Sequence, residues 1–327
     1  MKKIIIMLLS ACLLASCGGA GSVATVGDIK ITSGEFEFYL NSIKNQMKGT
    51  ELQTDEDWET QEIEGKKAID VAKQRALDIA VQNALYIETA EAAGITLSDA
   101  EKEQTEATKE QIVSSYGGEK AYKEFLKSNN ITDKFIEMMC KSTAYYQKIG
   151  DKINAETPVD ATEAQKYFEE NKTELEAEFR KAKHILIMTV DETTRQPKSE
   201  AELAEAKKLA EELLAQVKSG TDFDKLMNEY SEDPGLATAP DGYVFGSGEM
   251  VSEFEQATDS VGFGEIAFCE SSYGYHIIKR LPIEYADVSD RLTSKIMGER
   301  IDEQVKAWEE EYSVAVTKNE EALSEIK

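Results

Sequence analysis

Basic residues are few in this chain, and their scarcity limits the classes of molecule that it can bind. Lys and Arg number 37 against 63 Asp and Glu, which gives a formal net charge of −26 in 327 residues. Such acidity argues against nucleic acid as a partner and against adhesion to anionic lipid through charge alone. The hydrophobic content of 41% still provides enough apolar residues for globular cores.

Cysteine is too sparse for a disulfide framework or a metal centre. Beyond residue 17 only Cys140 and Cys269 remain, far apart and without the spacing of metal ligands. We interpret both as unpaired, because a free cysteine behaves as a small apolar side chain. No cofactor is expected.

The apolar run at the N-terminus is too short to span a bilayer as a permanent helix. Lys2 and Lys3 precede IIIMLLSACLLA, a form typical of a secretory signal. The run ends in LASC at Cys17, which resembles the lipobox of bacterial lipoproteins, whose cysteine is acylated and becomes the new N-terminus. An ordinary signal peptide with an incidental cysteine is the alternative. We expect residues 1–16 to be removed and the chain to be lipid-anchored to a bacterial membrane, outside the cytoplasm.

Apolar periodicity predicts a helical N-terminal domain over residues 17–177. VATVGDIKIT, residues 23–32, predicts a β-hairpin at its start. Beyond it, several helix starts carry a Ser, Thr or Asp followed three residues later by Glu, which is typical of N-terminal caps. Residues 51–64 carry seven carboxylates and are interpreted as an exposed loop.

The pattern changes at residue 178 and changes back near residue 284. Strand, helices and strands over 178–283 predict a compact α+β unit. Residues 284–327 return to helix, with an apolar stripe from Leu292 to Trp308 that we expect to pack on the N-terminal helical domain. The expected fold class is therefore α+β, with a small antiparallel sheet and its helices inserted between helical segments.

Histidine occurs only twice, and both copies lie in apolar, strand-like runs. His184 falls in KAKHILIM and His276 in YGYHIIKR. Two scarce titratable groups in matching settings predict two strands of one sheet and two halves of one site. Taken alone, they are also typical of core histidines with satisfied hydrogen bonds.

Two further motifs accompany the histidines and favour one shared site over two separate core histidines. They are YSEDPG at Tyr230–Gly235 and FGSGEMVSEF at Phe245–Phe254. With HIL at His184 and GYHIIK around His276, they resemble in order and spacing the parvulin-type peptidyl-prolyl isomerases. Together with the lipobox and the flanking helices, they make the whole chain similar to the SurA/PrsA group of foldase lipoproteins.

This resemblance implies an active site with three kinds of member. The two histidines would be paired on adjacent central strands, and Asp233 falls where the family carries Cys or Asp next to the substrate carbonyl. An apolar pocket would hold the proline ring, and two of its members, four residues apart, are expected on one helix face. The implied site residues are His184, Asp233, Phe245, Met250, Phe254, Tyr273 and His276.

The chain departs from the family pattern in two places. Pro240–Tyr243 replaces a common Gly-Asp-Leu-Gly stretch, which leaves that wall of the site undefined. The loop from Asp191 to Lys198 contains only two bases, Arg195 and Lys198, among acids. Because no basic triad is present for a phosphate, specificity for phosphorylated Ser/Thr-Pro is not expected.

The chemistry that the resemblance implies suits a site without metal, nucleophile or cofactor. An X–Pro bond rotates over a barrier of about 18–20 kcal/mol, and isomerisation takes tens to hundreds of seconds. A catalyst needs only to bind the twisted amide better than either planar form. An apolar lining and a fixed hydrogen-bond network around the carbonyl meet that need, with the histidines positioning rather than abstracting protons.

We therefore expect an exported, membrane-anchored prolyl isomerase and foldase that acts on unfolded exported polypeptides containing X–Pro bonds. A holdase with a catalytically weak parvulin unit is the main alternative. A lipoprotein that binds a small solute is disfavoured, because no two-lobed α/β pattern is present. Whether the chain forms a homodimer is left open by the sequence.

Overall fold

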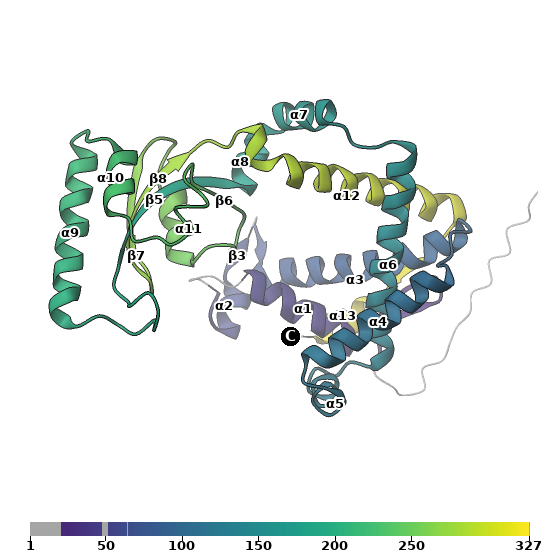
Figure 1. Ribbon diagram of the computed structural model, residues 1–327. Helices are drawn as coiled ribbons and strands as arrows, with labels where there is room; N and C mark the ends of the chain where they lie inside the picture. Colours follow the sequence, from purple (N-terminus) through teal and green to yellow (C-terminus); the bar gives the residue numbers. More distant parts are fainter. Residues whose placement is uncertain (1–20, 48–51, 64, 327) are drawn as a thin grey trace, which may run out of the picture. The chain divides into compact units, whose positions relative to one another are not determined.

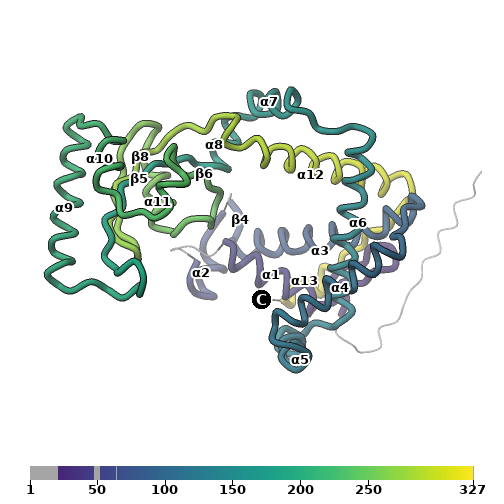
Figure 2. The backbone as a smooth tube through the Cα atoms, in the orientation of Figure 1, coloured from purple at the N-terminus to yellow at the C-terminus, as the bar shows by residue number. Residues whose placement is uncertain are grey.

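The computed structural model describes residues 21–47, 52–63 and 65–326 (Figures 1 and 2). The predicted signal peptide and Cys17 lie outside them. The chain divides into two compact units, one holding the described residues up to Ile149 together with Glu303 onward, the other holding Gly150–Asp302. The predicted domain boundaries at 178 and 283 therefore fall inside the second unit, which begins and ends within helices.

The first unit is helical and contains two small sheets. The predicted hairpin is confirmed as β1 and β2, and the long predicted helix is α3, which ends before Gly94. The elements are β1 Ser22–Val26, β2 Ile29–Thr32, α1 Ser33–Met47, α2 Asp55–Thr60, β3 Glu62–Ile63, β4 Lys66–Lys67, α3 Ala68–Ala92, α4 Asp99–Ser115, α5 Glu119–Ser128, α6 Asp133–Glu156, β9 Val316–Lys318 and α13 Glu320–Glu325. Helix α6 extends into the second unit.

The prediction of a loop over residues 51–64 was wrong in part, because a helix forms there. Thr54 and Asp57 bond reciprocally at the start of α2, with 3.2 Å from the Asp57 N–H to Thr54 Oγ1 and 2.6 Å from the Thr54 N–H to Asp57 Oδ2. Carboxylates in the first turn also favour a helix N-terminus. Trp58 is buried on this helix, so the acidic segment covers apolar residues.

The C-terminal segment is shared between the units. Helix α12, Tyr285–Tyr312, begins in the second unit, where Val288 and Leu292 pack in a cluster with Phe168 and Leu175. Further on, in the first unit, β9 pairs antiparallel with β1 and places Val316 opposite Val26. Helix α12 therefore packs in the second unit through Val288 and Leu292, and from Glu303 onward it belongs to the first unit.

The second unit is an α+β domain built on a four-stranded antiparallel sheet, as predicted. Its strand order is β6-β5-β8-β7, so the two histidine-bearing strands β5 and β8 are neighbours in the centre. The elements are α7 Ala161–Glu170, α8 Lys172–Glu178, β5 Arg180–Met188, α9 Glu200–Lys218, α10 Phe223–Tyr230, β6 Tyr243–Phe245, α11 Ser252–Asp259, β7 Ile266–Glu270 and β8 Gly274–Leu281.

Helices cover the two faces of this sheet unequally. Helices α9 and α10 lie over one face, where Ile185 and Ile277 belong to the buried core, and α11 lies over part of the other (Figure 1). Successive side chains of a strand point to opposite faces. His184 and His276 therefore both face the α11 side, which is the less covered one.

Both described cysteines are free, one on a helix and one on a strand. Cys140 is buried in α6. Cys269 lies on β7, opposite His276. Burial, helped by the charge of Glu253, raises the pKa of the Cys269 thiol to about 11, so it is a neutral thiol near pH 7.

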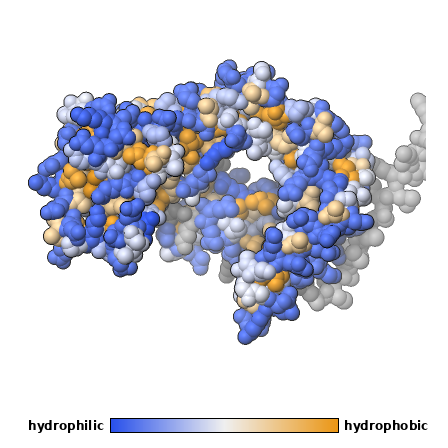
Figure 3. Space-filling view, in the orientation of Figure 1, coloured by the Kyte–Doolittle hydropathy of each residue, from blue (hydrophilic) through white to orange (hydrophobic). Residues whose placement is uncertain are grey.

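The surface agrees with the acidic composition. Hydrophilic residues cover most of the face seen in Figure 3. Among the helices that the structure describes, none is both long and apolar enough to cross a membrane.

Candidate active site

The register of the two central strands brings the histidines together. His184 lies opposite Ile278 and His276 lies opposite Leu186, so the two rings occupy diagonal positions on one face of the sheet. The rings stack with their centroids 5.3 Å apart and 19° between their planes. Their Nδ1 atoms are 3.1 Å apart, which is hydrogen-bond distance.

The second ring nitrogen of His184 contacts Asp233. Its Nε2 atom lies 3.0 Å from Asp233 Oδ2, and Tyr243 donates its hydroxyl to the same oxygen at 2.6 Å. The Gly235 N–H donates to the other oxygen, Oδ1, at 3.1 Å. Both carboxylate oxygens are thus held by fixed partners.

The motif that carries Asp233 is bonded directly to strand β5. The Leu186 N–H donates to Ser231 Oγ at 3.1 Å, and the Glu232 N–H donates to the Leu186 carbonyl at 2.8 Å. Glu232 also accepts the Met188 N–H at 2.6 Å. These bonds fix the turn before Pro234 against the strand that carries His184.

Ser271, which was not predicted as a site residue, completes the hydrogen-bonded group on the side of His276 away from Asp233. Ser271 Oγ lies 2.7 Å from His276 Nε2 and accepts the Tyr273 N–H at 3.1 Å. Ser271 and Gly274 also exchange backbone bonds across a two-residue turn that joins β7 to β8. This hairpin places Ser271 diagonally beside His276.

The acid–base properties of the group follow from burial and hydrogen bonding. Burial pushes the pKa of Asp233 upward, but the bonds from His184 and Tyr243 outweigh it and lower that pKa to about 2. Burial, with the neighbouring His184, lowers the pKa of His276 to about 4. Burial and the bond to Asp233 raise the pKa of Tyr243. At neutral pH, Asp233 is therefore ionised, while His276 and Tyr243 are neutral.

With both imidazoles neutral, the hydrogen bonds have one consistent direction. An ionised Asp233 can only accept, so His184 donates from Nε2, and its Nδ1 accepts from His276 Nδ1–H. The Nε2 of neutral His276 then accepts the hydroxyl of Ser271, which itself accepts the Tyr273 N–H. Along the chain from the β7–β8 turn to Asp233, each hydrogen-bond donor has one acceptor. A network satisfied in this way is rigid.

Apolar rings close the site beside the histidines. Phe254 is 3% exposed and lies edge-to-face on His184 and His276, at centroid distances of 5.2 and 5.5 Å. Phe245 is fully buried and lies 5.7 Å from the Phe254 ring. Met250 is half-buried and packs on the same cluster. The structure thus brings together all three members of the predicted apolar pocket.

The expected reason for their proximity was wrong, because Met250 is not helical. Helix α11 begins at Ser252, after an extended Val251, so Met250 lies in the preceding loop. Glu255 holds that loop by accepting the N–H groups of Gly248 and Met250 at 2.8 and 3.0 Å. A carboxylate one turn into the helix, not a shared helix face, sets the position of Met250.

Tyr273, implied as a site residue, is linked to the histidines through its backbone. Its side chain is 40% exposed and its ring lies under the Arg195 guanidinium, 5.5 Å from the centroid. Its link to the histidines is the backbone N–H that Ser271 accepts. Tyr243, in the stretch that departs from the family pattern, contributes the side-chain hydroxyl that contacts Asp233 instead.

The loop that carries Met250 is also tied to helix α12. Glu249 forms a two-pronged ion pair with Arg291, both N–O distances being 3.0 Å, and accepts the Gly246 N–H at 3.1 Å. The Arg291 guanidinium lies over the Phe179 ring, 5.3 Å from its centroid. Residues Gly246–Met250, which we call the pocket lip, are therefore positioned in part by helix α12 of the same unit.

We expect His276 to stay neutral until the pH falls to about 4, well below the ordinary value near 6.5. Between these values the unfolded chain binds a proton that the folded chain does not. The free energy of unfolding therefore has its full contribution from neutral His276 above pH 6.5. It falls by up to about 3 kcal/mol as the pH drops toward 4. The chain has only two histidines, so ¹H NMR titration of the ring protons measures this directly. A His276 midpoint near 6.5 would contradict the account.

Two family models match consecutive parts of the chain. The one described as SurA-like N-terminal domain matches residues 2–150, and the one described as PPIC-type PPIASE domain matches residues 166–281. The second match covers the sheet and every residue of the group described above. In the described parts of the chain, no cluster of His, Cys, Asp and Glu is arranged to hold a metal ion.

Curated relatives agree with both matches. Foldase protein PrsA of Caldanaerobacter subterraneus is 32% identical over 300 residues, which cover 87% of this chain and 85% of that protein. Foldase protein PrsA of Geobacillus kaustophilus is 41% identical over 103 residues, 31% of this chain and 34% of that protein. Chaperone SurA of Pseudomonas aeruginosa is 32% identical over 112 residues, 32% of this chain and 27% of that protein.

Proposed function

This chain belongs to the family of PrsA foldases and has a peptidyl-prolyl isomerase domain of the PPIC type, and we propose that its X–Pro isomerisation takes place at His184, Asp233 and His276. The observation that carries the proposal is the continuous chain of hydrogen-bond contacts from Ser271 through His276 and His184 to Asp233, placed beside the Phe254 ring. Hydrogen-bonding groups of fixed orientation next to an apolar surface favour the twisted form of the amide.

The geometry supports catalysis through differential binding of the twisted amide. In a planar X–Pro amide, resonance places partial negative charge on the carbonyl oxygen, and twisting removes that resonance. A carboxylate held beside the carbonyl disfavours the planar, polarised form more than the twisted one. Because the network is already oriented before substrate arrives, little reorganisation is needed in the transition state. No residue of the group forms a covalent bond or abstracts a proton.

Phe245, Met250 and Phe254 are proposed to hold the proline ring. Phe254 contacts both histidine rings, and Phe245 and Met250 pack in the same cluster; an apolar lining favours the less polarised twisted form. Acceleration of cis–trans exchange in a short X–Pro peptide, measured by NMR exchange spectroscopy with the full chain, tests this proposal. The absence of acceleration at saturating enzyme would contradict it.

Replacing Arg291 with glutamine is expected to raise KM for such a peptide about two- to fivefold and to leave kcat nearly unchanged. The change releases Glu249 and so loosens the pocket lip, but the pair is partly exposed and contributes at most about 1 kcal/mol. Arg300→Gln is the matched control, since Arg300 also lies on α12 and pairs with Glu163, away from the lip. Equal effects of the two changes would show that the lip is not positioned in this way.

Export and anchoring through Cys17 are proposed from the sequence. The lipobox-like LASC, the basic start and the short apolar run support removal of residues 1–16 and acylation of the cysteine. The proposed clients are unfolded exported polypeptides, which meet the foldase after they cross the membrane.

Mass spectrometry of the mature N-terminus is expected to find lipid-modified Cys17 as the first residue. Cys17→Ser is then expected to release the protein from membranes, because the acyl chains are the anchor. Its control is Cys12→Ser, which changes a cysteine within the segment to be removed and should leave the mature protein unaltered. Cleavage at another position, or an unmodified Cys17, would rule out the proposed anchor.

A further inference from the structure

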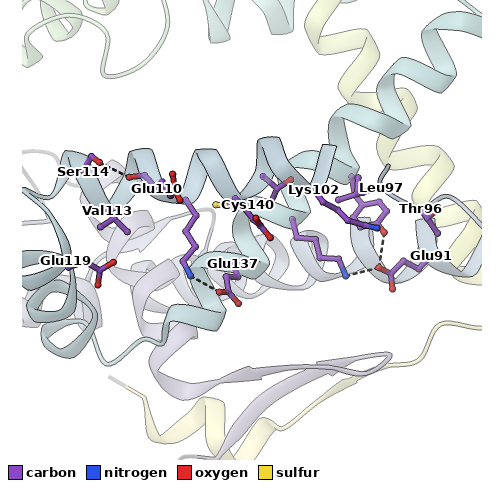
Figure 4. A pocket seen from close by; sticks show the side chains of 15 residues that line it. Glu91, Thr96, Leu97, Lys102, Glu110, Val113, Ser114, Glu119, Glu137 and Cys140 are labelled. Atoms are coloured by element: carbon purple, nitrogen blue, oxygen red, sulfur yellow. Dashed lines mark hydrogen bonds and ion pairs between the residues drawn. The ribbon is translucent and has the colours of Figure 1, made fainter. Parts of the chain in front are cut away.

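Helix α4 borders an open groove in the first unit. None of the residues of α4, all of which the structure describes, is buried. Between it and α6 lies a space of about 1030 Å³, lined from Glu91 and Leu97 at one end to Glu119 at the other (Figure 4). Val113 of α4 is half-buried at this space, whereas Leu97, Cys140 and Tyr145 are at most 7% exposed.

Charged contacts, rather than apolar packing, hold α4 in place. Lys109 pairs with Asp133 and Glu137 of α6 at 2.5 and 2.6 Å. Farther along, Lys148 of α6 pairs with Glu101 of α4 at 2.7 Å. These long side chains bridge the two helices and keep the groove between them open.

The groove has a narrow apolar floor and an acidic rim. Leu97, Val113, Cys140 and Tyr145 supply the apolar lining. Most of the rim charges are neutralised, as in Glu91, which pairs with Lys141 at 2.7 Å.

Two rim carboxylates of α4 stand apart from these pairs. Glu106 and Glu110 form no ion pair with any described residue, although they lie one turn apart on the same helix. Like charges at this spacing destabilise a helix by a few tenths of a kcal/mol. The groove therefore presents negative charge that no cation of the described chain balances.

An exposed aromatic pair extends the apolar surface past the end of α4. Tyr116, which ends this helix, is 42% exposed and stacks on Phe125 with ring centroids 4.1 Å apart.

We propose that this groove holds an extended segment of an unfolded client in which basic side chains alternate with apolar ones. Basic residues would meet Glu106 and Glu110, and the apolar residues between them would face the floor. Helix α4 lines the groove from Lys102 to Ser114, about 18 Å at 1.5 Å per residue, which an extended chain spans with about five residues. The proposal rests on the foldase function proposed above but not on the isomerase site.

Charge favours this occupant over a second copy of the chain. The protein carries a formal net charge of −26, so two copies repel each other at an already acidic rim. A cationic segment is attracted to the same rim, and the attraction falls as salt is added.

Binding of two short proline-free peptides to the full chain tests the proposal. In one, Lys alternates with Leu and Phe; in the other, Glu replaces every Lys. The lysine peptide is expected to bind the wild type at least about tenfold more tightly than the glutamate peptide. The double variant Glu106→Lys/Glu110→Lys is expected to reverse this preference. The matched control is Glu103→Lys/Glu124→Lys, which makes the same charge change at exposed positions outside the groove and should keep the wild-type preference within about twofold.

The possible outcomes separate this proposal from the foldase function. Equal loss of lysine-peptide binding in both double variants would overturn it, because net charge alone would then explain the attraction. A groove already closed by a second copy, seen as a dimer that the Glu106/Glu110 variant dissociates, would overturn it as well. If the wild type fails to suppress aggregation of an unfolded protein, the foldase function itself is contradicted. Val113→Asn, which changes the floor and no charge, should weaken the lysine peptide while leaving X–Pro isomerisation unchanged.

Discussion

Replacing Asp233 with alanine is expected to lower kcat/KM for X–Pro isomerisation about a hundredfold, equivalent to about 2.7 kcal/mol of transition-state stabilisation. The change removes the only charged member of the hydrogen-bond chain and leaves His184 Nε2 and the Tyr243 hydroxyl without their acceptor. His184 can then adopt the other tautomer, and the direction of the chain is lost. Steady-state kinetics on an X–Pro peptide measure the effect.

Asp233→Asn separates the charge from the geometry. Asparagine keeps an oxygen acceptor and the side-chain shape, so part of the network survives. We expect a loss of about tenfold, between wild type and alanine. Equal rates for wild type and Asp233→Ala would place the chemistry elsewhere in the domain.

Replacing Phe254 with alanine is expected to lower the free energy of unfolding of the second unit by about 3–5 kcal/mol, and to abolish most isomerase activity. The ring is 3% exposed and contacts both histidines and Phe245, so its removal leaves a cavity under the site. Both tryptophans, Trp58 and Trp308, lie in the other unit, so tryptophan fluorescence does not report on this one. The ring-proton NMR signals of the two histidines do, and urea titration followed through them measures the loss.

Met250→Ala provides the comparison that isolates binding. Met250 is half-buried and lies in the pocket lip, so truncation should cost less than about 1 kcal/mol of unfolding free energy. It should nevertheless raise KM several-fold, since it removes one wall of the proposed proline pocket. If Phe254→Ala unfolded like the wild type, the ring would not be part of the domain core.

Local signals in the sequence were sufficient for most of the elements. Reciprocal caps at Ser98–Glu101 and Ser199–Glu202 mark the starts of α4 and α9, and both form as expected. Strand periodicity located β5 and β8, since their apolar runs flank the two histidines. Such features depend on neighbours within four residues, which a sequence displays directly.

Features set by long-range contacts were missed or misassigned. Helix α2 was hidden because its seven-carboxylate surroundings are typical of exposed loops, although Trp58 signals a buried face. Strand β7 was missed because it is a short edge strand that ends at Glu270, and the turn residues that follow are not distinctive. Once that two-residue hairpin is known, its register places Cys269 opposite His276 and Ser271 diagonally beside it.

The site itself was only partly predictable. Motif order brought Asp233 and the histidines to one place, but it could not show which side chains complete their hydrogen bonds. Tyr243 lies ten residues beyond Asp233 and reaches it only because β6 pairs with β5. Tyr273 was implied as a site residue without a stated role; its ring lies under Arg195, and its backbone N–H donates to Ser271.

The central claim is that the isomerase centre is the hydrogen-bonded group of His184, Asp233 and His276, distinct from the surface that holds unfolded chains. Its most direct test is a proline-limited refolding reaction run with the full wild-type chain and with Asp233→Ala, each also assayed for suppression of aggregation. The account predicts that the wild type accelerates refolding, that the variant loses about a hundredfold in catalytic efficiency, and that both suppress aggregation equally. A wild type that suppresses aggregation without accelerating refolding, or a variant as fast as the wild type, would contradict it.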